Sequence, residues 1–251
     1  MTTLSPPRTL KVCGATSTRD IEVLAGAGAG LVGLWHGVPG GPADLPEHEV
    51  AALAAAVRAT GTLHPVLVTF LGDPDAVADV MRRTGIRTVQ LHAYQPPATV
   101  RALRTALPDA VIVKVLHVSD GTCPERPLIG AYERAGTDLF LIDATTADGR
   151  VGSTGQRLEE ETVLRLAERF TLPFWLAGGL TRTNRSAYER VLRHPRLRGI
   201  DVDTAARGGD GRFGAPEVAG LARAWDTGPG HPDPRTPSAT DTPTTRPTEQ
   251  P

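Results

Sequence analysis

The sequence is poor in aromatic residues, cysteine and lysine, and it contains no long apolar run. Aromatic side chains make up 4% of the 251 residues, whereas hydrophobic residues make up 40%. The core must therefore be built mainly from Val, Leu, Ile and Ala, which is typical of buried parallel strands and the helices that cover them. No segment approaches the ~20 apolar residues that span a bilayer. The first residues also lack the apolar stretch of a secretory signal.

The two cysteines and the balanced charge narrow the class of protein further. Cys13 and Cys123 cannot form a disulfide framework, which favours a reducing, cytoplasmic location. The net charge is −1, from 27 basic and 28 acidic residues. Because no strong field of either sign exists, we expect neither a nucleic acid nor a membrane as partner. A small molecule is the expected partner, and the chain could be a monomer or a homodimer.

Short β-type runs alternate with amphipathic helical stretches along most of the chain. The spacing of about 25–30 residues is the rhythm of βαβ units in a parallel sheet. A doubly wound sheet gives a similar pattern, but eight units without an early GxGxxG favour a closed (β/α)₈ barrel. We expect strands at 9–14, 30–37, 64–70, 87–93, 110–118, 138–144, 172–179 and 198–204. Helices are expected after residue 17, at 46–60, from 73, and at 97–107, 159–170, 183–193 and 215–225.

The last part of the chain has a different composition. Residues 227–251 are rich in Pro, Thr and Gly and have no periodic apolar positions. Such a segment cannot bury enough surface to fold. We therefore predict one catalytic barrel domain over residues 8–226 and a disordered tail over 227–251.

Candidate catalytic residues are expected where the strands end, because barrel active sites lie at that face. Cys13 ends the first strand and Asp143 the sixth. Taken singly, Cys13 would be a buried small hydrophobe and Asp143 a helix cap. Placed together around one mouth, they offer a thiolate and a carboxylic acid for moving protons. The glycine-rich segments 152–155 and 177–180, after strands six and seven, suit a phosphate site.

Several of these segments together resemble the phosphoribosylanthranilate isomerase family. The resemblance is carried, in order, by KVCGATSTRD, VQLHA, LIDA, GSTG, LAGGL and GIDVD, and it spans roughly residues 8–225. That family implies a cofactor-free barrel that catalyses the Amadori rearrangement of N-(5-phosphoribosyl)anthranilate in tryptophan biosynthesis. A bound metal or cofactor is therefore not expected.

The resemblance also implies a role for each matching residue. Asp143 would be the general acid, and Cys13, as thiolate, the general base. Lys11, two residues before Cys13 on the same face of the strand, could supply positive charge, or it could be a structural lysine paired with an interior carboxylate. Substrate contacts are expected from Lys11, His36, His92 and Asp201, with Asp201 near the amino nitrogen. Phosphate contacts are expected from Gly155, Gly178, Gly179 and Thr204.

Two departures from the family pattern fall on the parts that would hold the substrate. The family has a Ser-Pro-Arg stretch after strand two, whose Arg grips the anthranilate carboxylate. Residues 35–46 contain no Arg or Lys, and His36 is a weaker substitute. After strand eight, the family's Ser-Ser-Gly becomes Asp203-Thr204-Ala205. A carboxylate beside a phosphate is repulsive unless Asp203 turns away or meets a cation, and Arg207 is near it in sequence.

Other functions stay open at this point. The chain could be a related enzyme that acts on another aminosugar or carboxylic substrate, or a non-catalytic ligand-binding barrel. Lys114 on strand five could form a Schiff base, as in an aldolase, although a lysine inside a barrel is more often structural. His36, His92 and His117 lie on different strands without carboxylates at ligand spacing, so we interpret them as polar lining and predict no metal site.

Overall fold

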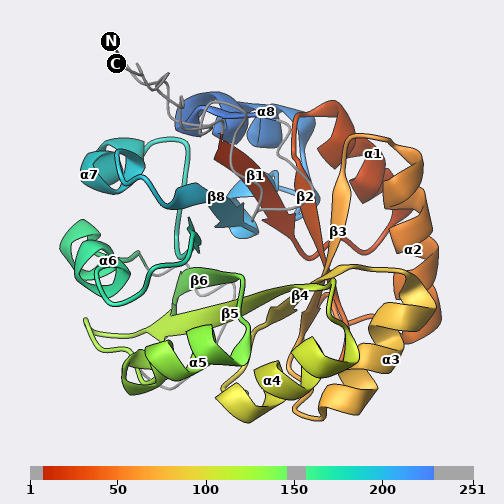
Figure 1. Ribbon diagram of the computed structural model, residues 1–251. Helices are drawn as coiled ribbons and strands as arrows, with labels where there is room; N and C mark the ends of the chain where they lie inside the picture. The colour runs from red at the N-terminus through yellow and green to blue at the C-terminus, as the bar shows by residue number, and fades with distance from the viewer. Residues whose placement is uncertain (1–7, 146–156, 229–251) are drawn as a thin grey trace, which may run out of the picture.

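The computed structural model describes residues 8–145 and 157–228. Over these residues, strands and helices alternate and the parallel strands close into a barrel (Figure 1). Closure is made by β1 (Arg8–Cys13), which pairs in parallel with both β2 (Leu31–Trp35) and β8 (Leu197–Val202). The predicted (β/α)₈ fold is therefore confirmed.

Most of the remaining elements occupy the segments that the sequence pattern predicts, although no helix was predicted between strands five and six. The other barrel strands are β3 (His64–Thr69), β4 (Thr88–Leu91), β5 (Val111–Val118), β6 (Leu139–Ala144) and β7 (Phe174–Leu176). The helices are α1 (Thr18–Gly26), α2 (Glu47–Ala59), α3 (Pro74–Thr84), α4 (Pro97–Ala106), α5 (Ile129–Ala135), α6 (Glu160–Ala167), α7 (Glu189–Leu192) and α8 (Ala215–Trp225). Short 3₁₀ turns η1 (Arg126–Leu128), η2 (Arg185–Tyr188) and η3 (Thr204–Ala206) complete the set.

Local sequence signals explain where helices begin and end. Ser17 caps α1 by accepting from the backbone N–H of Asp20, whose side chain accepts in return from the Ser17 backbone. This reciprocal pair satisfies N–H groups that a helix start leaves without partners. Helix α3 begins with Asp73 as its cap and Pro74 in its first turn, and it ends at Gly85 with φ +67°. Glycine adopts that conformation without steric cost.

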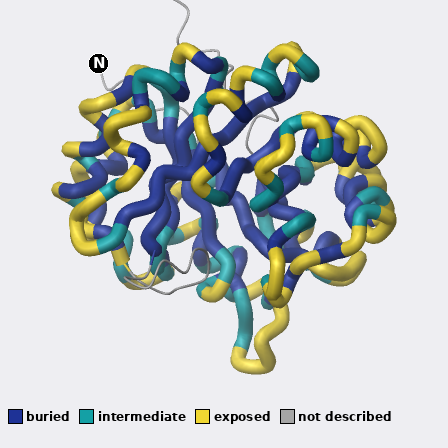
Figure 2. Tube along the Cα trace, turned by 90° about the horizontal axis from the view of Figure 1, so that it is seen from below, coloured by how far each residue is buried: buried dark blue, intermediate teal, exposed yellow. Residues whose placement is uncertain are grey.

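The buried side chains form two layers, one on each side of the barrel wall. Apolar residues between strands and helices form the larger layer, and a smaller set fills the barrel interior. The strands are buried almost throughout, whereas exposed residues lie on the helices and loops (Figure 2). Val111, Val113 and Val115 of β5 show the inward alternation that strand geometry imposes. Toward the carboxyl ends of the strands, the inward residues become polar, and this change positions the site.

The end of the barrel lies slightly beyond the predicted domain boundary. Thr227–Gly228 form a two-residue strand, β9, beside β1. These two residues fall within the segment 227–251 that was predicted as a tail, and the rest of that segment (229–251) lies outside the described residues. The glycine-rich segment 152–155 also lies outside them. No helix within the described ranges is long and apolar enough to cross a membrane.

Candidate active site

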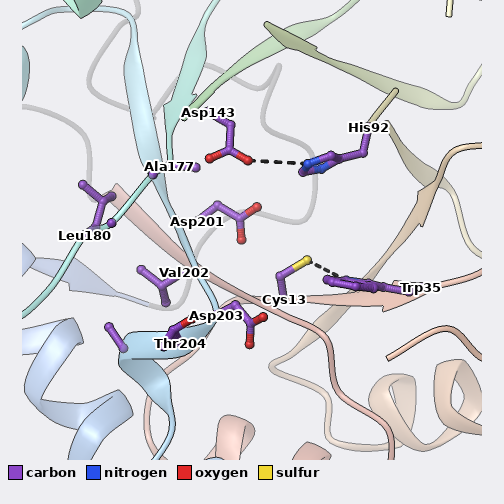
Figure 3. Close-up of a pocket in the computed structure, with 13 residues that line it drawn as sticks. Cys13, Trp35, His92, Asp143, Ala177, Leu180, Asp201, Val202, Asp203 and Thr204 are labelled. Atoms are coloured by element: carbon purple, nitrogen blue, oxygen red, sulfur yellow. Dashed lines mark hydrogen bonds and ion pairs between the residues drawn. The ribbon is translucent and has the colours of Figure 1, made fainter. Parts of the chain in front are cut away.

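A pocket opens at the carboxyl ends of the strands and gathers most of the predicted site residues (Figure 3). Side chains from β1, β2, β4, β6 and β8 and the backbone after β7 meet around it. Its lining consists of Cys13, Trp35, His92, Asp143, Ala177, Gly178, Gly179, Leu180, Asp201, Val202, Asp203, Thr204 and Ala205. Residues that are far apart in the chain thus face one small space.

Cys13 is the last residue of β1 and lies at the base of this pocket. Its side chain is buried, and Sγ accepts a hydrogen bond of 3.0 Å from the indole nitrogen of Trp35. Burial raises the pKa of the Cys13 thiol to about 12, although the nearby Lys11 ammonium acts to lower it. A thiolate at this position therefore depends on the donors and cations that surround the sulfur.

Lys11 does not line the pocket but lies buried beneath it. Its Nζ donates to Oδ2 of Asp201 on β8 at 2.7 Å, across the register that pairs these two residues. The Asp201 carboxylate holds the pKa of Lys11 above its ordinary value, although burial acts in the opposite direction. Of the two roles considered for Lys11, pairing with an interior carboxylate is observed, and its charge is shared between Asp201 and Cys13.

Asp201 lines the pocket and uses one of its carboxylate oxygens to bind Lys11. While Oδ2 accepts from Lys11, Oδ1 is buried without a hydrogen-bond partner among the described residues. An unsatisfied buried carboxylate oxygen is costly, so its presence in a pocket wall favours a donor on a bound ligand.

Asp143, the residue before the last of β6, lies on the other side of the pocket from Cys13. Burial, reinforced by the charge of Asp201, raises the pKa of Asp143 to about 7. A carboxyl group in this condition holds a proton near neutral pH and can donate it. The electrostatics of the pocket therefore suit Asp143 to the role of general acid.

His92, from β4, faces Asp143. Its Nε2 is 3.5 Å from Oδ2 of Asp143, and burial lowers the pKa of His92 well below its ordinary value. The imidazole is therefore neutral, and the contact is not an ion pair. The amide nitrogen of Gln90 lies 2.7 Å from Nδ1, and donation from this amide would leave the imidazole proton on Nε2, toward the pocket.

The candidate phosphate end lies where β7 and β8 finish. Gly178 and Gly179 line the pocket with φ of +87° and +60°, a backbone conformation that favours glycine. Thr204, at the start of η3, lies beside them. Gly155, the fourth predicted phosphate ligand, lies outside the described residues.

Asp203, the carboxylate that departs from the family pattern here, is held by Arg207. Nε of Arg207 donates to Oδ1 of Asp203 at 2.7 Å, and Nη2 donates to the carbonyl of Gly14 at 3.1 Å. The guanidinium also lies over the Phe213 ring, 4.0 Å from its centroid. Arg207 thus meets the negative charge of Asp203 and joins the end of β8 to the residue that follows Cys13.

On β2 the residue that faces the pocket is Trp35, and His36 is not part of the lining. Nδ1 of His36 lies 2.8 Å from the carbonyl of Leu45. This placement does not support His36 as a substitute for the family's arginine. His36 is the later residue near the end of the strand, whereas alternation from Gly33, which pairs with Cys13, directs Trp35 inward. That alternation was the signal that could have identified Trp35.

Lys114 and His117, from β5, form a buried group behind the pocket wall. Nζ of Lys114 donates to the carbonyls of Ala93 and Val115, each at 2.7 Å, and His117 lies 2.6 Å from Glu125. Burial lowers the pKa of Lys114 to about 8, but neither residue lines the pocket. This placement gives no support to a Schiff-base aldolase. Within residues 8–145 and 157–228, no group of three or more His, Cys, Asp or Glu could hold a metal ion.

Comparison with known sequences identifies the same family that the sequence motifs resemble. Residues 10–206 match the sequence profile of the family described as N-(5'-phosphoribosyl)anthranilate isomerase. A protein with that name from Microcystis aeruginosa is 30% identical over 216 residues, which cover 84% of this chain and 93% of the relative. Another from Haloarcula marismortui is 32% identical over 178 residues, covering 70% of this chain and 77% of the relative.

Comparison with solved structures supports the fold. Phosphoribosylanthranilate isomerase from Thermotoga maritima superposes with a TM-score of 0.69 at 21% identity, covering 87% of this chain and 98% of that one. Another phosphoribosylanthranilate isomerase structure, in complex with reduced 1-(o-carboxyphenylamino)-1-deoxyribulose 5-phosphate, gives a TM-score of 0.66 at 20% identity, over 86% of this chain and 98% of that one. At these identities the superpositions bear on the barrel alone.

Proposed function

The chain belongs to the N-(5'-phosphoribosyl)anthranilate isomerase family, and from that premise we propose that it converts N-(5'-phosphoribosyl)anthranilate, an aminoaldose, into the corresponding 1-deoxyribulose phosphate, an aminoketose. The observation that carries the proposal is the meeting of Cys13 and Asp143 in one pocket. One is a potential base and the other an acid whose pKa lies near neutrality.

Asp143 starts the reaction as the general acid. It protonates the ring oxygen of the ribose, and the bond between that oxygen and C1 breaks as the nitrogen lone pair moves in to form an iminium. The raised pKa of Asp143, caused by burial and by Asp201, keeps the required proton on the carboxyl group. His92, neutral and adjacent, would donate its Nε2 proton toward the carboxylate that forms.

Cys13 completes the rearrangement as the general base. Its thiolate removes the proton on C2, the electron pair forms the double bond of an enolamine, and tautomerisation gives the ketone with a methylene at C1. The substrate gains one proton at the ring oxygen and loses one at C2, so the conversion is an isomerisation. The enzyme resets when one proton passes from Cys13 to Asp143. Asp201 would accept from the substrate nitrogen through Oδ1, which has no described partner.

The phosphate would bind where β7 and β8 end. Gly178, Gly179 and Thr204 offer backbone and hydroxyl donors there, and Arg207 offsets the charge of Asp203. Gly155 is proposed as a fourth contact from the family pattern alone. The phosphorylated sugar is the proposed partner, and a cytoplasmic location is supported by the two free thiols, Cys13 and Cys123.

The anthranilate end differs from the family pattern. Among the described residues that line the pocket, none is Lys or Arg. We therefore expect substrate affinity to rest more on the phosphate and on Asp201 than on an ion pair with the anthranilate carboxylate.

Two substitutions in the intact chain test the proposal. Cys13→Ser and Asp143→Asn should each lower kcat by about a hundredfold or more, because proton transfer by a positioned group contributes on the order of 10²–10⁴ in rate. Product formation from phosphoribosylanthranilate, followed by fluorescence, measures this. Cys123→Ser and the exposed Asp109→Asn are matched controls that should stay near wild-type activity.

A second assay tests the substrate in the cell. The wild-type gene should restore growth without tryptophan to a bacterium that lacks this isomerase, and the two active-site variants should not. If soluble wild-type protein neither complements nor turns over the substrate, the proposed substrate is wrong. If both variants retain full turnover, the acid–base assignment is wrong.

A further inference from the structure

The sulfur of Cys13 has a dedicated hydrogen-bond donor on the neighbouring strand. The Trp35 indole nitrogen lies 3.0 Å from Sγ, inside the range for a hydrogen bond to sulfur, and both side chains are buried. Figure 3 shows the indole edge directed at the sulfur from the β2 side of the pocket. The contact brings a donor to the atom that the proposed reaction requires as an anion.

A glycine on strand β2 leaves room for the sulfur of Cys13. Gly33 pairs with Cys13 in the register, and a Cβ at Gly33 would lie 2.6 Å from Sγ and 3.1 Å from Val68. Only glycine leaves the space that the sulfur fills. Two residues later, on the same face of the strand, Trp35 fills the adjoining space with its ring and points its N–H back at Sγ.

The loop after β2 holds the indole in place. A Cβ at Gly41 would lie 3.1 Å from Cε3 of Trp35 and 2.8 Å from Val38, so the loop backbone passes close over the ring. The backbone N–H of Leu45 donates to the carbonyl of Trp35 at 3.0 Å, and Val38 and Ala43 belong to the same apolar cluster as Trp35. The segment that lacks the family's arginine is thus packed against the donor to Cys13.

The charged groups around Cys13 largely offset one another. Lys11 favours the thiolate, whereas Asp201 and Asp203 disfavour it. Lys11 is paired with Asp201, and Arg207 with Asp203. Across the pocket stand Asp143 and the neutral His92. The indole N–H of Trp35 carries no net charge. Its stabilisation of the Cys13 thiolate is therefore added to the balanced effects of these charged groups.

We propose that Trp35 is a positioning residue for the isomerisation, which holds and stabilises the Cys13 thiolate through its indole N–H. The inference rests on the proposed function, in which Cys13 is the base. A hydrogen bond from N–H to an anionic sulfur is charge-assisted and stronger than one to a neutral thiol, so the contact favours ionisation. It also fixes the direction from which the sulfur approaches the substrate.

The decisive variant is Trp35→Phe, made in a Cys123→Ser background so that Cys13 is the only thiol. Removing a hydrogen bond to a charged group should lower the thiolate fraction at a fixed pH about ten- to a hundredfold. The rate of Cys13 alkylation by iodoacetamide at a fixed pH is proportional to the thiolate fraction and measures this, and kcat at neutral pH should fall by a similar factor with KM within about threefold. Trp225→Phe is the matched control, because it also loses an indole hydrogen bond, to the carbonyl of Thr181, while Trp225 itself is not among the residues that line the pocket.

A second substitution is needed in case Trp35→Phe leaves a cavity that destabilises the protein. Site-specific replacement of Trp35 by 3-benzothienylalanine retains the bicyclic shape and removes only the N–H, so the same fall in the Cys13 alkylation rate is expected. An unchanged alkylation rate in this variant, together with an inactive Cys13→Ser enzyme, overturns the role of Trp35 and leaves the proposed function standing. A fully active Cys13→Ser enzyme overturns the base itself and, with it, the part of Trp35 in the reaction.

Discussion

The burial of Asp143 destabilises its charged form, and the same effect keeps the proton that its proposed role as general acid requires. A carboxyl group that ends a buried strand loses the solvation of its charge, and Asp201 adds repulsion; together they raise its pKa to about 7. Lys11 is also buried, but its ammonium stays charged because the carboxylate of Asp201 lies 2.7 Å away. Asp143 at the pocket and Lys11 beneath it thus both hold a proton, which leaves the carboxyl group neutral and the amine charged.

The raised pKa of Asp143 leads to a prediction about stability. Between its ordinary value of 3.8 and about 7, the folded state binds a proton that the unfolded state does not. Stability from this group is therefore full at low pH and is lost as the pH rises through 7. At about 1.4 kcal/mol for each pH unit, the free energy of unfolding falls by about 4 kcal/mol.

Asp143→Asn removes this titration, so the variant should be more stable than the wild type at pH 8 and nearly equal to it near pH 4. Urea unfolding at several pH values, followed by circular dichroism, measures the difference. Asp109→Asn, at an exposed position, should show no such trend. A difference between Asp143→Asn and the wild type that is independent of pH would contradict the assignment of the raised pKa.

At the scale of elements, the loop after β8 is tied to β1 by one arginine. Arg207 contacts the carboxylate of Asp203, the carbonyl of Gly211 and the carbonyl of Gly14. Gly14 has φ +89°, and a Cβ there would lie 3.2 Å from the guanidinium. The two loops therefore pack closely at the point where the proposed base and the proposed phosphate site meet.

This arrangement predicts that Arg207→Ala weakens substrate binding more than it slows the reaction. With the positive charge of Arg207 no longer beside Asp203 near the phosphate, KM should rise about tenfold, equivalent to about 1.4 kcal/mol, with kcat changed by less than about threefold. The double variant Arg207→Ala with Asp203→Ser should return KM to within about threefold of wild type, because the repulsive carboxylate is gone.

Steady-state kinetics on the single and double variants measure both constants, and the exposed Arg212→Ala is the control. A KM that stays high in the double variant would show that Arg207 acts on the phosphate or the loop directly. In that case charge compensation of Asp203 is not its main role.

At the scale of the whole molecule, the barrel is completed by α8 and the short strand β9. Trp225 ends α8 fully buried; its indole donates to the carbonyl of Thr181, and its ring packs against Tyr188 at a centroid distance of 5.7 Å. Strand β9 then pairs with β1. The part of the chain that the structure describes thus closes its core and its sheet by Gly228.

Truncation at two points tests where the folded domain ends. A chain that stops after residue 228 should keep its melting temperature within about 2 °C and its full isomerase activity. A chain that stops after residue 224 loses Trp225 and β9, and should lose at least about 3–5 kcal/mol of stability, the usual cost of deleting a buried large aromatic side chain. Differential scanning calorimetry and the isomerase assay compare the two. Lower stability after the first truncation would show that residues 229–251 contribute to the fold.

The sequence by itself determined the barrel and the two strand ends where Cys13 and Asp143 lie. Strand alternation, helix caps such as Ser17 and the repeated βα spacing are local properties, so they can be read without knowing which segments meet. The tertiary structure decided which side chains touch: Trp35 on Cys13, Lys11 on Asp201, and Arg207 bridging Asp203 and Gly14. These contacts depend on strand register and on closure of β8 against β1. The pKa values that follow from them depend on burial, which no local pattern specifies.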